Sequence, residues 1–504
     1  MSKGALPVLV GVGQAVSHWD GSQSPEDAPS PHSLNVEATE AALADAGMAA
    51  SEIEIILLAR TNDDCYPKPR RPHGANLNYP GTLADEIGAQ PKELVYNISG
   101  GQSAQQSVNE AAARIHAGEA DCILLAGSEA TKASRAAERN GIDIDWSGAS
   151  EQPVIDRGVG FDVINQTEIA HGLYRPPWLY ALIENAMAAE AGQTRTQRRA
   201  LMSKLWARFA AVARNNPYSQ FQPDFDAEFL ATPSKANYPF ADPFLKWHMA
   251  QDSVNQGAAL IIVSDSKADA LGIPQDKRVY LHGAGEAAEP AFTERPGFTE
   301  SWAMDVAINR ALGQAGKRQE DMQVFDLYSC FPCAVYSSTA VLGIDPYTET
   351  RPLTVTGGLP FSGGPGNNYS MHAIAAMAER LRAQPGDFGL VLANGGWLSK
   401  EAVGIWSTEK PDAFTPVAPM AKRGDDILVA IEETPDTGVL ESFTVSHGRN
   451  GPDLGIILAR TEDGKRFIAH AKPDAMARLL EEESPVGMSV QAESSDGRNY
   501  FTWA

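Results

Sequence analysis

A tyrosine and two cysteines lie within six residues of each other, directly after an apolar stretch, as Tyr328, Cys330 and Cys333. A phenol can donate a hydrogen bond to a developing enolate or exchange a proton with a hydroxyl group. Each thiol is either a nucleophile or a buried packing residue. The Cys-x-x-Cys spacing also occurs in redox and zinc sites, but a zinc site needs a second ligand pair, and no histidine stands nearby. We therefore expect reduced thiols and no metal.

A second group of polar residues follows in the turn GGPGNNY and just beyond it. Its members are Gly364, Asn367, Asn368, Tyr369, His372 and, after the next apolar run, Asn394. The asparagine amides either donate to a carbonyl oxygen or serve as turn residues with left-handed geometry. The histidine points either at a site or into an interface. The turn is thus a candidate elbow of an active site.

The chain is internally duplicated, and the duplication predicts how these residues are positioned. Residues 41–58 resemble residues 310–327, and the segment from Gly100 resembles the segment from Pro365, at a spacing of about 268 residues. Each copy runs through a helix, a glycine turn and an apolar strand. Ligands of open α/β sheets bind outside the carboxyl ends of the strands. The chemistry should therefore lie where the two glycine-rich elbows face each other.

The pattern divides the chain into three parts, as expected for 504 residues. Residues 1–275 form a first half, within which about 126–249 have no counterpart in the second half and are interpreted as a lid. Residues 276–410 form the second half. After a Pro-rich linker, 411–504 read as five short strands and a helix, beginning with ILVAIEE at 427–433, and resemble an OB-type barrel.

Composition excludes several classes of partner. The chain is 43% hydrophobic and 21% charged, with no apolar run long enough to cross a bilayer and no signal-peptide pattern. We expect a cytoplasmic protein. A net charge of −23 argues against nucleic acid and membrane surfaces as partners. The pair Gly11-Val12-Gly13 lacks the full dinucleotide fingerprint, so no NAD site is predicted.

Several motifs together resemble the thiolase superfamily, nearest to its sterol-carrier-protein-type members. They are VGVGQ, PPWLYALIENA, NQGAALIIVSDSKADALGI, FDLYSCFP, GGLPFSGGPGNNY and LANGGW. The resemblance covers residues 5–410 and implies an α/β fold with two similar halves in αβαβα layers. The tail, with FTVSHGRNGPDLGIILAR, is similar to the extra domain of one thiolase-like subgroup and to OB-fold, acyl-CoA-binding subunits of thiolase-like aldolases.

The nucleophile of the family is absent from this sequence. Family thiolases carry a cysteine at the first elbow, where the helix N-terminus lowers the thiol pKa. The matching residue here is Ser99, or Ile98 if the register is set on Gly101. Ser99 is either a replacement nucleophile or a residue that caps or lines the turn. A serine without a neighbouring base is a poor nucleophile at neutral pH.

The family's acid–base residues are absent as well. The Gly-His-Pro motif reads Gly363-Gly364-Pro365, and the second cysteine is replaced by Ala393. The His-Asp-Cys-Phe motif reads Tyr328-Ser329-Cys330-Phe331, so that a phenol stands where the family has an oxyanion-binding imidazole. Ping-pong thiolysis through a cysteine acyl-enzyme is therefore not expected. We expect Tyr328, Tyr369, His372, Cys330 and Ser99 to be the candidate catalytic residues.

The resemblance implies an acyl-CoA thioester as substrate, without a further cofactor, and a homodimer formed by edge strands. Basic residues on one predicted helix are a candidate patch for the coenzyme A phosphates, or else a solvated face. They are Arg195, Arg198, Arg199, Lys204, Arg208 and Arg214. Three functions stay open: acyl transfer with unusual residues, retro-aldol cleavage of a β-hydroxyacyl-CoA, and a non-catalytic acyl-CoA-binding or scaffold protein.

Overall fold

Two similar halves share one long sheet in the computed structural model, which describes residues 4–65, 70–160, 163–424 and 427–504. The strand order is β10-β11-β12-β9-β1-β8-β4-β2-β3-β5. In that order the strands are Val324–Asp326, Phe388–Gly395, Lys400–Ser407, Val279–Ala288, Pro7–Val16, Gln256–Ser264, Cys122–Glu129, Ile55–Leu58, Glu93–Tyr96 and Ile155–Asp156. β1 and β9 meet through two residue pairs, so each half keeps its own set of strands.

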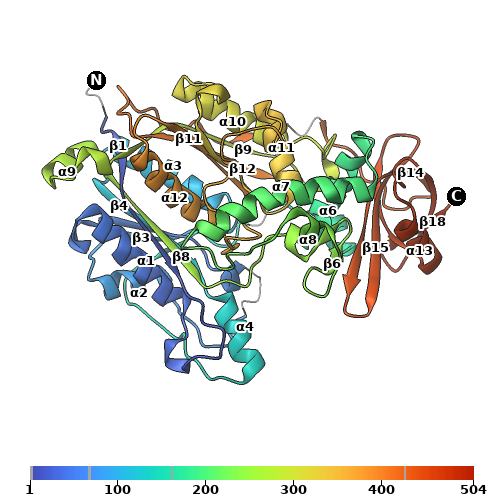
Figure 1. The fold of residues 1–504 in the computed structure, drawn as a ribbon, viewed down its shortest axis with the longest axis horizontal. Coiled ribbons are helices and arrows are strands. Elements are labelled where there is room, and N and C mark those ends of the chain that lie inside the picture. The colour runs from blue at the N-terminus through green and yellow to red at the C-terminus, as the bar shows by residue number, and fades with distance from the viewer. Residues whose placement is uncertain (1–3, 66–69, 161–162, 425–426) are drawn as a thin grey trace.

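Helices form three layers around these strands (Figure 1). α1 (Pro31–Ala46) packs on β1 and β8, and α10 (Trp302–Ala315) packs on β9 and β12. α3 (Ser103–His116) and α12 (Tyr369–Ala383) contact each other and strands of both halves. The αβαβα layering is thus confirmed, with α3 and α12 in the middle. Among the described residues, no helix has both the length and the apolar character needed to span a bilayer.

Glycines at equivalent positions bring helix and sheet together in both halves. A Cβ on Gly13 would lie 2.0 Å from a backbone carbonyl of α1, and one on Gly285 would lie 2.0 Å from a carbonyl of α10. The two helices end at Gly47 (φ 65°) and Gly316 (φ 61°), each in the left-handed conformation that favours glycine. The Gly-x-Gly pair of the first strand therefore serves helix packing.

Further segments of the chain pair with β3 at one end of the long sheet and with β10 at the other. β5 pairs with β3 at one end. At the other end, the N–H groups of Phe325 and Leu327 donate to the carbonyls of Pro352 and Leu353, at 2.9 and 3.0 Å. Covered edges cannot pair with the edge of a second copy. We expected a homodimer formed by edge strands. The paired residues of β3 and β10 are not available for such pairing.

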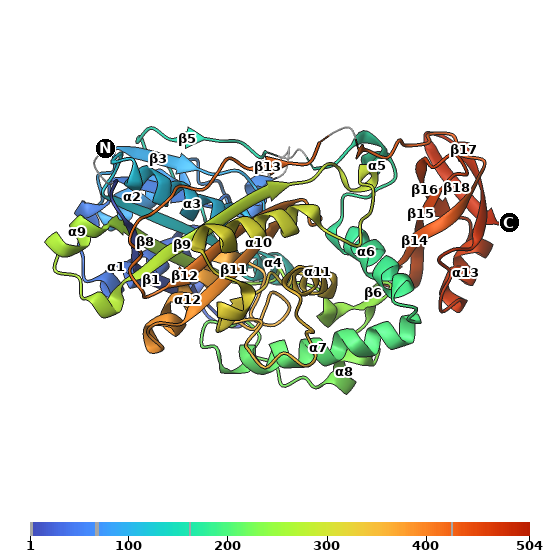
Figure 2. The same ribbon diagram turned by 90° about the horizontal axis from the view of Figure 1, so that it is seen from above.

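The insertion connects the halves to the C-terminal part (Figure 2). Its helices are α4 (Thr131–Asn140), α5 (Gln166–Ala170), α6 (Pro176–Glu190), α7 (Arg195–Asn215) and α8 (Ala227–Ala231). α6 and α7 both contact α11 (Pro332–Leu342), which follows the second-half strand β10. β6 (Pro239–Ala241) and β7 (Phe244–Leu245) extend the C-terminal sheet by pairing next to β14. The insertion is therefore a bridge between two sheets as well as a cover of the second half.

The C-terminal domain is rich in β-structure. Its elements are β14 (Thr437–Gly448), β15 (Gly451–Arg460), β16 (Arg466–Ala471), α13 (Pro473–Glu481), β17 (Ser489–Ser495) and β18 (Arg498–Trp503). They pair in the order β14-β15-β16-β18-β17-β14, with two short contacts, β16–β18 and β14–β17. The segment 427–433, predicted as a strand, is not one, because Ile427 and Leu428 are exposed and the segment forms one isolated bridge. The fifth strand is β18.

Candidate active site

The two glycine-rich elbows face each other, as the duplication predicts. The Gly100 N–H donates to the Asn367 side-chain oxygen at 2.7 Å, and the Ser370 hydroxyl donates to the Gly101 carbonyl at 3.3 Å. These contacts join the N-terminus of α3 to the N-terminus of α12. The candidate site is therefore the region around this junction, to which both halves of the duplicated fold contribute residues.

The asparagines of the second elbow connect it to the first half of the molecule. Asn367 Nδ2 donates to the Arg60 carbonyl at 2.7 Å and to the Cys65 sulfur at 3.1 Å. Asn368 Nδ2 donates to the Gly127 carbonyl. Gly364 donates from its N–H to the Gln251 carbonyl at 2.9 Å. These amide groups have structural partners, so a role in the turn is favoured over carbonyl recognition. The left-handed geometry expected of these residues is not adopted: Asn368 has a φ of −104°, and Asn367 does not have a positive φ.

Tyr369, the first residue of α12, is anchored through its hydroxyl. The oxygen lies 3.1 Å from Asp326 Oδ1 and 2.6 Å from the Thr356 hydroxyl. Asp326 is fully buried and also accepts the Val355 N–H at 2.9 Å. Burial raises the pKa of Asp326 to about 6, although the hydrogen bonds it accepts oppose the shift. Asp326 lies two residues before Tyr328, and no pattern in the sequence marked it as a site residue.

Tyr328 differs from Tyr369 because its hydroxyl is unengaged. The two rings make an edge contact with centroids 5.4 Å apart. A Cβ on Gly101 would lie 2.3 Å from the Tyr328 oxygen, so this glycine is what allows the phenol to reach the first elbow. Within the described residues, only burial and the nearby Cys330 and Glu401 act on the pKa of Tyr328, and no hydrogen bond does. Burial raises the pKa of Tyr328, so the hydroxyl is neutral and can donate.

The two cysteines after Tyr328 are buried, protonated thiols. Burial raises the pKa of Cys330 to about 12, and it also raises the pKa of Cys333. Neither is in a disulfide. Among the described residues, no group of three or more His, Cys, Asp or Glu side chains could hold a metal. A neutral thiol is a weak nucleophile, so the geometry does not favour covalent catalysis by either residue.

Asn394 links Cys330 to the insertion. Asn394 Nδ2 donates to the Tyr180 hydroxyl at 2.8 Å and lies 3.7 Å from the Cys330 sulfur. The Tyr180 hydroxyl in turn donates to the Gly396 carbonyl at 2.9 Å, and its ring stacks on Phe331 with centroids 4.3 Å apart. Tyr180 lies in the motif PPWLYALIENA, which marked the family resemblance but gave no sign of this role.

Ser99 and His372 have little support as catalytic groups. The Ser99 hydroxyl is buried without a partner among the described residues, and it does not cap α3, which begins at Ser103. His372 Nδ1 lies 2.9 Å from the Gln14 side-chain oxygen in β1. Burial lowers the pKa of His372 to about 3, so its ring is neutral and faces the sheet between the halves.

Three of the six basic residues predicted to bind phosphate, Arg195, Arg198 and Arg199, have structural partners. Arg195 donates to the carbonyls of Leu479 and Glu482 at the end of α13, both at 2.6 Å, and pairs with Asp242. Arg198 pairs with the buried Glu184 at 2.5 Å. Arg199 also lies beside Asp242, at 3.3 Å. Occupied, largely buried guanidinium groups argue against a coenzyme A phosphate site here.

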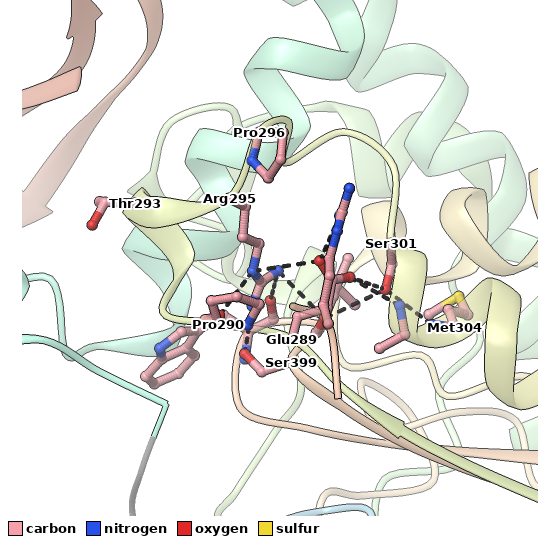
Figure 3. Close-up of polar contacts among 12 residues, drawn as sticks. Glu289, Pro290, Thr293, Arg295, Pro296, Ser301, Met304 and Ser399 are labelled. Carbon is pink, nitrogen blue, oxygen red and sulfur yellow. Dashed lines mark hydrogen bonds and ion pairs between the residues drawn. The ribbon is translucent and has the colours of Figure 1, made fainter. Parts of the chain in front are cut away.

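A buried arginine fixes the loop that follows Asn394 (Figure 3). Arg295 donates to the carbonyls of Trp397 and Leu398, at 2.9 and 3.3 Å, and to the Ser399 hydroxyl at 2.6 Å. Arg466 of the C-terminal domain donates to the Arg295 carbonyl at 2.7 Å. The C-terminal domain is therefore connected to the site loop through two buried guanidinium groups.

Comparisons with known proteins agree with this architecture. A family model for the thiolase-like protein type 1 additional C-terminal domain matches residues 424–497. A monomeric SCP2-thiolase-like protein type 1 from Mycobacterium smegmatis is 34% identical, with 100% of each chain covered and a TM-score of 0.82. No curated protein matches the chain.

Two more distant structures share the fold. The Ltp2–ChsH2(DUF35) aldolase is 18% identical over 80% of this chain and 98% of its own, with a TM-score of 0.59. An acetyl-CoA acetyltransferase from Syntrophomonas wolfei is 16% identical over 81% of this chain and 100% of its own, with a TM-score of 0.57. At these identities the likeness shows the thiolase fold alone.

The full-length relative is described as monomeric, so the homodimer expected from the resemblance is not supported. The extra C-terminal domain and the 34% identity over the whole chain agree on one assignment. This chain belongs to the SCP2-thiolase-like proteins of type 1.

Proposed function

We propose that this protein binds acyl-CoA thioesters and cleaves or forms the carbon–carbon bond of a β-hydroxyacyl-CoA by a retro-aldol reaction. One observation carries the proposal: a neutral, unengaged phenol at Tyr328 reaches the N-terminal elbow of α3. A retro-aldol reaction needs a proton carrier for the β-hydroxyl and donors for the enolate oxygen, and it needs no acyl-enzyme. An aldolase and an acetyltransferase both occur on this fold, so the choice between the two reactions rests on the site.

The first elbow can supply the enolate donors. The N–H groups of Gly101 and Gln102 precede α3 and have no acceptor within the described residues. Backbone N–H groups at a helix N-terminus stabilise developing negative charge. A thioester oxygen placed there would lie beside the Tyr328 hydroxyl, since that hydroxyl approaches Gly101. The first elbow thus offers donors for an enolate oxygen without a cysteine.

Tyr328 carries the proton in the proposed step. The neutral phenol accepts the proton of the β-hydroxyl as it passes its own proton to the α carbon, while the bond between the α and β carbons breaks and an aldehyde or ketone forms. The electron pair of that bond passes into the thioester as an enolate, whose oxygen the elbow N–H groups hold. With the α carbon protonated, a shortened acyl-CoA leaves. The residue ends in its starting state.

Catalysis through an acyl-enzyme receives no support from the site. Cys330 and Cys333 are buried and Cys65 is half-buried. Burial raises the pKa of all three thiols, to about 12 for Cys330 and about 11 for Cys65. The Ser99 hydroxyl has no base beside it. Acyl transfer with unusual residues is therefore the weaker mechanism.

A non-catalytic acyl-CoA-binding protein is the second candidate. The observation that favours it is the burial of the site, where Tyr328 and Cys330 are 6% and 7% exposed. The second-elbow amides are also committed to structural bonds. Such a protein would bind acyl-CoA and leave it unchanged.

Binding and turnover separate these candidates. We expect β-hydroxyacyl-CoA esters, and matched acyl-CoA esters without the hydroxyl, to raise the melting temperature of the full chain. Only the hydroxyl-bearing esters should release acetyl-CoA or propionyl-CoA, measured by mass spectrometry. Binding without release from any ester would contradict the retro-aldol proposal and favour the non-catalytic protein.

We further propose that the C-terminal domain acts on the rest of this chain or on acyl-CoA, not on nucleic acid. Residues 411–504 hold 16 Asp and Glu against 9 Lys and Arg. An OB-type domain that binds single-stranded nucleic acid needs a positively charged groove. The bonds from Arg466 into the second half support an intramolecular role.

Light scattering tests the oligomeric state. A molar mass of 54 kDa at every protein concentration would agree with a monomer.

A further inference from the structure

Glu401 is a buried carboxyl group without hydrogen bonds beside the candidate site. It lies on β12, directly opposite Asn394 of the antiparallel neighbour β11. Opposed residues of an antiparallel pair point to the same face, with Cβ atoms about 4.5–5.5 Å apart. Both Glu401 oxygens are buried, and neither has a partner within the described residues. An ionised carboxylate in such a place would lack every donor that normally stabilises it.

The neighbouring charges do not supply the missing donors. Arg295 directs its guanidinium to the loop carbonyls, to Ser399 and, at 3.9 Å, to Glu289 (Figure 3). Glu289 accepts the Ser301 hydroxyl and the Ala303 N–H, each at 3.1 Å, and pairs with Arg423 at 3.2 Å. Glu289 is therefore well supplied with donors by the protein, whereas Glu401 has none within the described residues.

The orientation of Asn394 follows from Tyr180. The Gly396 carbonyl can only accept, so the single Tyr180 hydroxyl proton is used there. The Asn394 atom that faces the Tyr180 oxygen must then be the donor, Nδ2. Its Oδ1 therefore points elsewhere, and it is buried without a partner within the described residues. An unpaired acceptor and an unpaired carboxyl stand on the same face of adjacent strands.

We propose that Glu401 is a neutral carboxylic acid that donates a hydrogen bond to Asn394 Oδ1 and so fixes the amide at the candidate site. One proton satisfies both groups, because the protonated carboxyl is a donor and the amide oxygen is an acceptor. Burial and the nearby Glu289 raise the pKa of Glu401, in agreement with the neutral form, while Arg295 opposes the shift.

This arrangement makes Glu401 a positioning residue, and its effect on turnover rests on the proposed function. Asn394 faces Cys330 and the Tyr180 hydroxyl, and its backbone carbonyl approaches Gly101 of the first elbow. An ionised Glu401 would repel Asn394 Oδ1 and also lie close enough to raise the pKa of Tyr328. The neutral acid keeps both the amide and the phenol in place.

Infrared difference spectroscopy tests the protonation without any need for turnover. The spectrum of the wild-type chain minus that of Glu401→Gln at neutral pH should show the carbonyl stretch of a protonated carboxyl group. Other buried acids cancel in the difference. A difference that shows ionised-carboxylate bands in place of this stretch would overturn the proposal, whether or not the protein turns over any acyl-CoA.

Two substitutions test the hydrogen bond, with Glu289→Gln as the matched control. Glutamine keeps the shape and a donor, so Glu401→Gln should melt like the wild type, whereas Glu289→Gln should melt lower because Arg295 and Arg423 lose a charge partner. Glu401→Met should lower kcat by about tenfold with little change in KM, and Glu401→Gln should restore it. Equal destabilisation by Glu401→Gln and Glu289→Gln would contradict a neutral Glu401. If the wild type has no turnover, the spectra and melting data still decide.

Discussion

Tyr328 and Tyr369 place the same chemical group on the two sides of one site, with opposite surroundings. The Tyr369 hydroxyl lies between a buried carboxylate and a threonine. The Tyr328 hydroxyl lies against a glycine at a helix N-terminus and has no partner within the described residues. Both tyrosines belong to the second half, so two residues of one half have diverged in role. The second elbow holds the two halves together, and the first elbow keeps the groups that can act on a substrate.

Removal of the Tyr328 hydroxyl should have the largest effect. Tyr328→Phe keeps the ring contact with Tyr369 but deletes the proton carrier. We expect kcat for β-hydroxyacyl-CoA cleavage to fall by ~10²–10⁴-fold, while acyl-CoA affinity and melting temperature change little. Steady-state kinetics and thermal melting measure these quantities.

Tyr347→Phe is a suitable control for that substitution. Tyr347 shares a 2.7 Å hydroxyl contact with Tyr336, outside the elbows, so its loss should leave turnover unchanged. Near-normal turnover in Tyr328→Phe would show that the residue is a packing aromatic. The asymmetry between the two tyrosines would then have no catalytic meaning.

Asp326 should make the anchored side of the site sensitive to pH. Its folded-state pKa, about 6, lies above the usual value of 3.8, so the folded state binds the extra proton. The stability linked to this proton is present below about pH 4 and is lost as the pH rises through 6. The pKa difference corresponds to about 3 kcal/mol.

The comparison of wild type with Asp326→Asn isolates this contribution. Other buried carboxyl groups, such as Glu129 and Glu184, also have raised pKa values and add to the slope in both proteins. The free energy of unfolding, measured with denaturant between pH 4 and 7, should therefore fall less steeply with rising pH in the variant than in the wild type. Parallel curves for the two proteins would mean that Asp326 is not the group that titrates.

The duplication made the elbows predictable from sequence, because glycine turns and helix ends are local signals. Side-chain partners were not predictable in the same way. Arg195 looked like part of a basic face, yet its acceptors are backbone carbonyls 284 or more residues later. The coverage of β3 by β5 also depends on a two-residue strand with exposed side chains. Such contacts have no periodic pattern that a sequence could reveal.

Glu401 and Asp326 show a second limit of sequence reasoning. Each lies in an apolar strand where a single acidic residue looks like a surface position. Both are fully buried, and their protonation depends on which donors the fold places near them. Asp326 has several donors, whereas Glu401 has none among the described residues. A sequence shows the carboxyl group but not its hydrogen bonds.

Removal of the Tyr369 hydroxyl should affect stability more than chemistry. Tyr369→Phe leaves buried Asp326 and Thr356 each without one partner, which typically costs ~1–3 kcal/mol. The unfolding free energy should fall by about this amount, and turnover should fall less than in Tyr328→Phe. Denaturant unfolding and kinetics of both variants measure the contrast. A turnover loss equal to that of Tyr328→Phe, at unchanged stability, would mean that both tyrosines act on the substrate.

The smallest effect should follow from Ser99, at the family's nucleophile position. Its hydroxyl is buried, unpaired within the described residues and without a base, so Ser99→Ala removes an unsatisfied polar group and should leave turnover within about twofold. Ser337, another buried unpaired hydroxyl, on α11, provides the matched Ser337→Ala control. Incubation with acetyl-CoA or acetoacetyl-CoA, acid quenching and peptide mapping should detect no acyl group on Ser99. A stoichiometric acetyl adduct there would show that Ser99 is a nucleophile, and Tyr328 would then be its acid–base partner.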